Sequence, residues 1–330
     1  MKRLLPLLLF LLSLVATAQN DTIKNKNLEK DSSRFDWEKI VIDWDDITWD
    51  ETINLFYDPG YVTFTQGLGN MEPLLFEANI IPYYRVGIDA IEKWAFILSP
   101  QIILRMYNDF SYPVRTPSYK PRITLVHQSS KHTREYHDWF QYISLFHHSN
   151  GQDGYFYTDS TNTVINTRNG SFSTNWVEAG VFESRAHSSR QYYAKLYAQY
   201  CYQRDTMLND IYGRWRFNLD LKFEWDIAKT LSKLNFKHFD NKETILSNTF
   251  KFGVICGNME HRDNIDWKRG IIDYTISFRP SFLQDVCVFV QYYCGEDYYN
   301  IYFNRILQCV RFGLTAQSRF FTRESVVKNN

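Results

Sequence analysis

Three residues whose side chains can act together in hydrolysis lie near the middle of this chain. His147 precedes Ser149 by two residues in the stretch His147-His148-Ser149-Asn150-Gly151, and Asn175 ends the stretch Ser171-Phe172-Ser173-Thr174-Asn175. Side chains two residues apart on a β-strand point to the same face. If both stretches belong to neighbouring strands, a serine nucleophile, a histidine base and an orienting amide can come within reach of one another.

Each of these residues has a separate chemical task. A serine hydroxyl is a poor nucleophile until a base takes its proton, and a histidine can do so near neutral pH. The neutral amide of Asn175 can fix the imidazole tautomer without burying a full charge. His148 competes for the role of base, but period two places it on the opposite face from Ser149. A simpler reading of Ser-Asn-Gly is a surface turn.

Composition narrows the class of protein. The 330 residues carry no net charge, which argues against nucleic acid as the main partner. Aromatic residues make up 17% of the chain, yet the mean hydropathy is −0.40. Beyond the N-terminus no segment approaches the roughly 20 apolar residues of a membrane-spanning helix. This balance suits a membrane β-barrel, and also a soluble β-protein with a large core.

The ends of the chain differ from its centre. Residues 1–18 read as a secretory signal, with Lys2 and Arg3 before an apolar run and Ala16-Thr17-Ala18 as a cleavage site, so we expect an exported protein. Residues 19–55 are polar and acidic, 56–322 are the predicted barrel domain, and 323–330 are a tail. The five cysteines form no CxxC pair and are expected to act as small apolar residues on strands.

Period two is the dominant pattern of the central domain. From Arg214 to Asp226, apolar and polar residues alternate strictly, which predicts a strand of about 43 Å with Trp215 and Trp225 near its ends. Eleven or so such runs occur, near residues 74–80, 93–107, 120–130, 136–149, 173–185, 191–204, 214–226, 246–258, 270–280, 285–294 and 310–320. They favour an all-β, transmembrane antiparallel β-barrel in an outer membrane, because closure removes exposed strand edges in lipid. A soluble β-sandwich is the alternative.

The alternation also predicts which face carries the candidate residues. Before the motif, the apolar positions include Ile143 and Leu145, and the same parity continues to His147 and Ser149. In the second run, Asn175 shares parity with apolar residues beginning at Val177. All three candidates are therefore expected on the lipid-facing wall, where a lipid substrate would lie.

These stretches together resemble a known family, the outer-membrane phospholipases A. The first motif resembles the family's H-x-S-N-G, and the second is similar to its S-x-S-x-N. The remaining similar segments are Ser111-Tyr112-Pro113-Val114-Arg115-Thr116-Pro117-Ser118-Tyr119-Lys120-Pro121, Gly295-Glu296, and Gln308-Cys309-Val310-Arg311-Phe312-Gly313. The resemblance covers roughly residues 70 to 320. It implies a barrel of about twelve strands that hydrolyses acyl esters of phospholipids and lysophospholipids, depends on calcium and is active as a homodimer.

The resemblance also implies a role for each matching residue. Ser149 would be the nucleophile, His147 the base and Asn175 its orienting group, with the backbone N–H of Gly151 donating to the oxyanion. The implied Ca²⁺ ligands are Ser171, the carbonyl of Gln152 and Ser111 from a second subunit. The family usually has arginine in place of Gln152, and the connection from Gly151 to Ser171 is longer here. The alternative from another class is a non-catalytic barrel, porin-like or structural.

Overall fold

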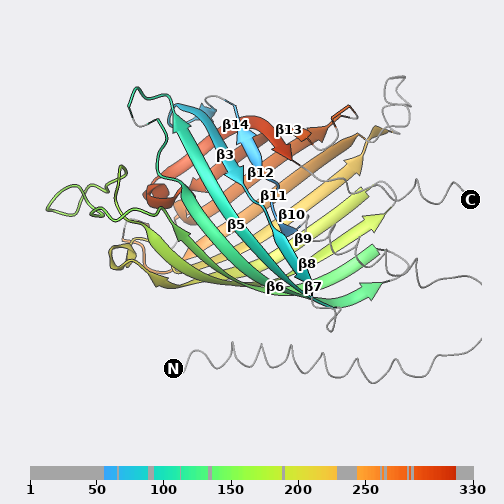
Figure 1. Ribbon diagram of the computed structural model, residues 1–330. Helices are drawn as coiled ribbons and strands as arrows, with labels where there is room; N and C mark the ends of the chain where they lie inside the picture. The colour runs from blue at the N-terminus through green and yellow to red at the C-terminus, as the bar shows by residue number, and fades with distance from the viewer. Residues whose placement is uncertain are drawn as a thin grey trace, which may run out of the picture. The chain divides into compact units, whose positions relative to one another are not determined.

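The central part of the chain folds into one antiparallel sheet that closes on itself as a barrel (Figure 1). The computed structural model describes residues 56–64, 67–87, 93–111, 113–132, 136–187, 190–228, 244–260, 262–263, 266–280, 282–283 and 286–316. The predicted signal sequence, the acidic segment 19–55 and the tail 323–330 lie outside these residues. In the described part of the chain, no helix has the length and apolar character needed to cross a membrane.

Strands follow one another around the barrel largely in chain order. They are β1 (Tyr61–Thr63), β2 (Leu68–Gly69), β3 (Leu74–Ile80), β4 (Tyr84–Gly87), β5 (Trp94–Tyr107), β6 (Ser118–His132), β7 (Tyr136–Ser149), β8 (Ser173–His187), β9 (Arg190–Arg204), β10 (Trp215–Asp226), β11 (Ile245–Cys256), β12 (Gly270–Arg279), β13 (Val286–Glu296) and β14 (Ile306–Ala316). Short 3₁₀ helices are η1 (Thr206–Leu208), η3 (Trp267–Arg269) and η4 (Asn300–Asn304).

The named strands occupy twelve positions around the barrel. Strands β3 and β4 both pair with β5 and act as one strand, interrupted where Pro82 has no N–H to donate. Strands β1 and β2 likewise share β14 as their partner, and β1 also pairs with β3, which closes the ring. The predicted all-β barrel is confirmed.

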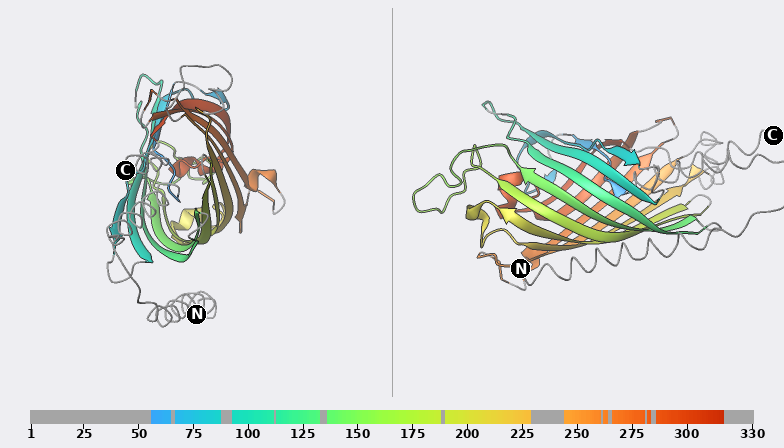
Figure 2. Two further views of the ribbon diagram at one scale, coloured as in Figure 1. Left: turned by 90° about the vertical axis from the view of Figure 1, so that its right-hand side faces the viewer. Right: turned by 60° about the horizontal axis from the view of Figure 1, so that its bottom comes forward.

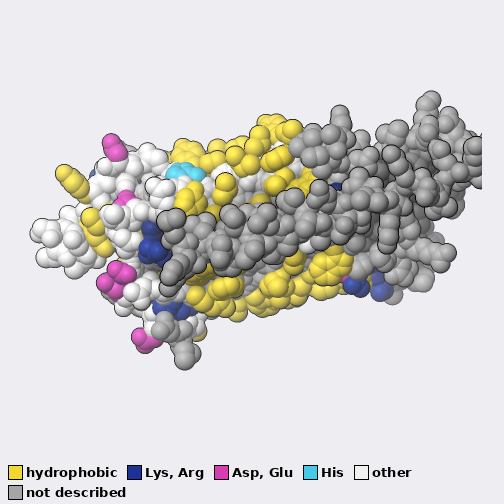
Figure 3. All heavy atoms as spheres, turned by 90° about the horizontal axis from the view of Figure 1, so that it is seen from below, with side chains coloured by type: hydrophobic (Ala, Val, Ile, Leu, Met, Phe, Trp, Pro, Cys, Tyr) yellow, Lys and Arg dark blue, Asp and Glu magenta, His cyan; other side chains and the backbone are white. Residues whose placement is uncertain are grey.

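Alternation along the long strands separates an apolar outer wall from a polar interior. On β10, the side chains of Trp215 and Phe217 are 43% and 51% exposed on the outside. Between them, Arg216 points inward and pairs with Glu296 at 2.5 Å. Figure 3 shows hydrophobic side chains gathered along the outer wall, with many polar ones at the end that carries the long loops. This wall has the character that lipid contact requires.

Several charged side chains inside the barrel form ion pairs. Arg105 donates to Glu77 at 2.6 Å and to Asp297 at 2.9 Å, and Arg311 donates to Glu77 at 2.7 Å. All four side chains are almost completely buried. Because an isolated buried charge is costly, removing one partner from such a network destabilises the fold strongly. The network therefore ties the β13–β14 connection to β3 and β5, close to where the barrel closes.

Aromatic side chains also fill part of the interior. Near the loop end, η4 enters the barrel mouth (Figure 2), and Phe303 packs in a buried cluster with Phe172 and Trp176 of the β8 region. Further along the barrel, Phe56 lies 4.7 Å from Tyr142 between ring centroids. A cavity of about 340 Å³ remains inside the barrel, and its lining includes Phe56. The buried cluster around Phe303 supports the end of β7 and the start of β8.

The five cysteines are all free and all lie on strands. Cys201, Cys287 and Cys309 are buried, and Cys256 and Cys294 are partly buried. Their positions on strands agree with the expectation that they act as small apolar residues.

Candidate active site

The end of β7 and the start of β8 bring the candidate residues together on the outer wall. The two strands pair without a register shift, so that His147 lies directly opposite Asn175 and Ser149 directly opposite Ser173. His147, Ser149 and Asn175 are each partly exposed. Leu145, one step earlier on the same face, is 53% exposed, whereas the intervening His148 is 5% exposed. The site therefore continues the apolar outer face, as strand parity predicts.

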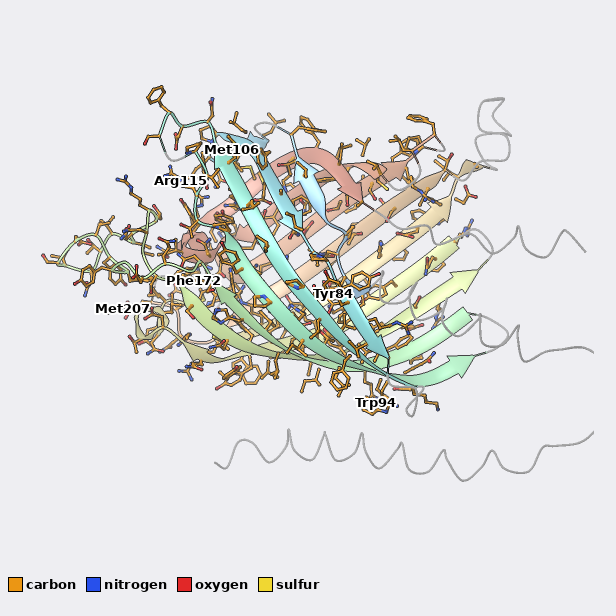
Figure 4. All side chains as sticks on the ribbon, in the orientation of Figure 1. Tyr84, Trp94, Met106, Arg115, Phe172 and Met207 are labelled. Atoms are coloured by element: carbon orange, nitrogen blue, oxygen red, sulfur yellow. The ribbon has the colours of Figure 1, made fainter. Side chains whose placement is uncertain are left out.

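Figure 4 places the site along the barrel. Phe172, which directly precedes β8, lies at the end with the long loops, whereas Trp94 at the start of β5 lies at the opposite end. Asn175 follows Phe172 closely on β8, and His147 and Ser149 lie opposite this part of β8. The three candidate residues therefore lie near the loop end of the wall. Near this end, the apolar outer face of the strands borders the polar rim of the barrel.

His147 and Asn175 are joined by a hydrogen bond. His147 Nδ1 lies 2.8 Å from Asn175 Oδ1. Since an amide oxygen can only accept, Nδ1 must carry the proton, and this assignment follows from the hydrogen-bond network. The neutral imidazole then has an unprotonated Nε2. That nitrogen is the atom that a general base needs.

Ser149 stands on the same face as His147, one step further along β7. Among the described residues no hydrogen bond joins its hydroxyl to the imidazole, and such contacts are often loose before substrate binds. The next turn is held by Gly151, whose φ of +65° favours glycine. An added Cβ there would meet the ring of Tyr119 at 3.5 Å. Backbone N–H groups in such turns are available to bind an anion.

Asn150 holds this turn against β8. Its side chain is 2% exposed, and its Nδ2 donates to the carbonyl of Gly170 at 2.8 Å. Its Oδ1 accepts from the backbone N–H groups of Phe172 at 3.1 Å and Gln152 at 3.2 Å. One buried amide thus fixes both ends of the long connection that surrounds Gly151.

The connection itself is stabilised by a carboxylate. Asp159 accepts hydrogen bonds from Thr161, from Thr163 and from the backbone N–H of Val164 at 2.8 Å. These bonds hold the pKa of Asp159 well below its ordinary value. The residues inserted here form a hairpin of their own, because Tyr157 pairs with Ile165. Asp159 is therefore satisfied within the hairpin.

The structure brings one unpredicted residue to the predicted calcium ligands. Ser171 donates its hydroxyl hydrogen to Asp205 Oδ2 at 3.0 Å. Asp205 follows β9 directly, and its other oxygen accepts from Met207 N–H at 3.2 Å, which caps η1. Hydroxyl, carboxylate and carbonyl oxygens are ligands that Ca²⁺ prefers, so the donor types fit this ion. The described residues contain no group of three His, Cys, Asp or Glu side chains that could hold a metal.

The other two predicted ligands are exposed. Gln152 follows the glycine turn, and Ser111 lies in the β5–β6 connection beside the fully exposed Phe110. Among the described residues no hydrogen bond joins Ser111 to Ser171 or Gln152. An exposed loop position is what a contact with a second subunit requires.

His148 has a different environment from His147. Its ring faces the interior and meets the ring of Phe172 edge-on, with 4.9 Å between centroids. It cannot reach Ser149 from that side of the sheet. Of these two histidines, only His147 lies on the strand face of Ser149.

Comparison with solved structures finds outer membrane barrels of similar fold. The outer membrane phospholipase A of Escherichia coli has a TM-score of 0.51 and 13% sequence identity, covering 79% of this chain and 97% of that chain. The calcium-bound dimer of Salmonella typhi outer membrane phospholipase has a TM-score of 0.51 and 14% identity, covering 79% of this chain and 91% of the other. The NanC porin matches with a TM-score of 0.38 and 10% identity.

Sequence comparison adds no further assignment. No protein-family model matches the chain, and no curated protein matches it. At 13–14% identity the structural matches concern the fold alone. This chain has the barrel fold of outer membrane phospholipase A.

Proposed function

We propose that this protein is a calcium-dependent phospholipase of an outer membrane, which hydrolyses acyl esters of phospholipids and lysophospholipids (A1/A2 type). The observation that carries the proposal is the 2.8 Å bond between His147 Nδ1 and Asn175 Oδ1 on the lipid-facing wall, with Ser149 on the same strand face. Polar groups facing lipid are costly unless they serve one another or a ligand. A lipid ester is the substrate that such a location would meet.

In the proposed reaction, His147 Nε2 takes the hydroxyl proton of Ser149 while the serine oxygen attacks the acyl carbonyl carbon. A tetrahedral intermediate forms, and His147 then returns the proton to the departing lysophospholipid oxygen. Water repeats the sequence on the acyl-serine and releases the fatty acid. Asn175 holds the tautomer throughout, and the N–H of Gly151 donates to the oxyanion.

We further propose that Ca²⁺ is held by Ser171, the carbonyl of Gln152 and Ser111 of the partner subunit. The Asp205 carboxylate, 3.0 Å from Ser171 Oγ, supports a cation there because it supplies negative charge beside the hydroxyl. When bound, the ion would supply positive charge that stabilises a developing oxyanion. Because one ligand would come from a second copy, the active form would be a homodimer.

The alternative is a non-catalytic barrel, porin-like or structural. Its support would be the polar interior and the cavity of about 340 Å³. Against a wide pore, η4 lies in the mouth (Figure 2) together with its aromatic neighbours, and interior side chains such as Arg105 and Asp297 form ion pairs inside the barrel. The outer-wall bond of His147 and Asn175 has no purpose in a channel.

Fatty-acid release from detergent-dispersed phospholipid in the presence of calcium tests the proposal. Wild-type protein should release fatty acid, and Ser149→Ala should abolish the release. Ser144→Ala is the matched control, because Ser144 lies on the same strand but faces the interior, bonded to Thr124 at 2.8 Å. The control should keep its activity. Wild type that releases no more than Ser149→Ala would leave the non-catalytic barrel.

A further inference from the structure

The outer wall carries a third polar side chain in line with His147 and Asn175. Gln203, at the end of β9, lies directly opposite Asn175 in the strand pairing. Asn175 Nδ2 donates to Gln203 Oε1 at 3.4 Å. Three strands thus contribute one row of linked side chains, from the imidazole through two amides.

A β-bulge brings Gln203 to this wall. Asn175 pairs with Gln203, but the next residue, Trp176, pairs with Cys201, so Tyr202 has no partner across the strands. Cys201, two residues before Gln203, is 1% exposed and faces the interior. Regular alternation would therefore turn Gln203 inward as well. The extra residue leaves both Tyr202 and Gln203 exposed on the outside. Bulges often re-aim a side chain beside an active site.

Gln203 acts on the orientation of the Asn175 amide. An amide can present either its oxygen or its NH₂ group to His147. Only the oxygen selects the tautomer with a free Nε2, whereas the NH₂ group would donate to Nδ1 and leave the proton on Nε2. An acceptor on the other side of the amide settles the choice. Gln203 Oε1 is that acceptor.

We propose that Gln203 is a positioning residue, which orients Asn175 and through it keeps His147 in the tautomer that can accept the serine proton. This inference rests on the proposed function for its kinetic consequence. Its structural consequence, the His147 tautomer, can be measured without any turnover.

The kinetic test removes the acceptor while keeping the shape. Gln203→Met should lower kcat about threefold to tenfold, the loss expected for one modest hydrogen bond, and leave KM unchanged. Tyr202→Phe, the neighbouring residue of the bulge, is the matched control and should keep the wild-type kcat. A Gln203→Met enzyme with wild-type kcat would overturn the proposal.

A double-variant cycle separates positioning from a general loss of structure. Asn175→Asp has two accepting oxygens, so the orientation that Gln203 selects no longer matters. In that background, Gln203→Met should change kcat less than twofold. Equal losses in both backgrounds would show that Gln203 supports the strand rather than the amide.

The tautomer itself is read from ¹⁵N shifts of His147 in detergent micelles, assigned with a His147→Gln variant. Wild type should show a protonated Nδ1 and an unprotonated Nε2, and Gln203→Met should show a mixture. An unchanged tautomer in Gln203→Met would refute the positioning role even if the protein proved to have no lipase activity. Absent turnover with the expected tautomer change would refute only the proposed function.

Discussion

The buried amide of Asn150 gives the most demanding prediction about the site. Asn150→Ala removes three hydrogen bonds at once, to the carbonyl of Gly170 and from the N–H groups of Phe172 and Gln152. Each net bond contributes about 0.5–1.5 kcal/mol, and a backbone group left buried without a partner costs more. The expected loss of unfolding free energy is therefore about 2–4 kcal/mol.

Asn150→Ala should also lower kcat. Because the carbonyl of Gly170 and the N–H of Phe172 frame the turn that holds Gly151, its N–H should lose its fixed direction. Removing an oxyanion donor costs about 10²–10³ in kcat, so a misdirected one should cost up to about 10². Urea unfolding in detergent micelles gives the free energy, and fatty-acid release gives kcat.

Asn166→Ala serves as the control for Asn150→Ala. Asn166 Nδ2 donates to the carbonyl of Tyr155 and to Asn169 Oδ1, and its Oδ1 accepts from the backbone N–H groups of Arg168 and Asn169, but all these bonds are exposed and water can replace them. Its loss should remain within about 0.5 kcal/mol. If Asn150→Ala were as stable and as active as Asn166→Ala, the argument that one buried amide holds the turn would be refuted.

Three further predictions concern charges. Glu178→Ala should lower the unfolding free energy by about 3–5 kcal/mol, because Arg122 loses a carboxylate at 2.9 Å inside the barrel, and an unchanged urea midpoint would contradict this. Asp205→Asn should raise the calcium concentration for half-maximal activity while leaving the rate at saturating calcium near wild type; an unchanged calcium titration would exclude Asp205 from the cation site. The lowered pKa of Asp159 means that its contribution to hairpin stability is present above the ordinary aspartate range and is lost as pH falls through the lowered pKa, so the protection of the Val164 amide, its exchange rate relative to that of an unstructured peptide at the same pH, should be high at neutral pH and fall only in acid. In Asp159→Ala the same amide should have little protection at any pH.

The fold could be predicted from the sequence because its main signal is periodic. The alternation from Arg214 to Asp226 fixed both the strand and its faces, and the structure places Trp215 outside and Arg216 inside, as predicted. The break at Pro82 and the short strands β1 and β2 were not predicted, since two or three paired residues carry no period.

The contacts around the site were harder to predict, because they join residues with no fixed spacing. Asp205 meets Ser171 only after β8 and β9 have run the length of the barrel and back. The sequence indicates Asn150 as a turn residue, but its buried side chain bonds to Gly170 and Phe172, which lie at the far end of the long connection. Tertiary packing decides both positions.

Counting along the strand predicts the wrong face for Gln203. Counting from Lys195, alternation assigns Gln203 to the interior, and no glycine near it indicates a bulge. Strands β7 and β8, in contrast, pair without a shift from Tyr136 to Ser149, so counting along them gives the face on which His147, Ser149 and Asn175 lie. Period two therefore assigns a face only as far as the register is unbroken. The residues that orient a site can lie just beyond that point, because a bulge is what turns them toward it.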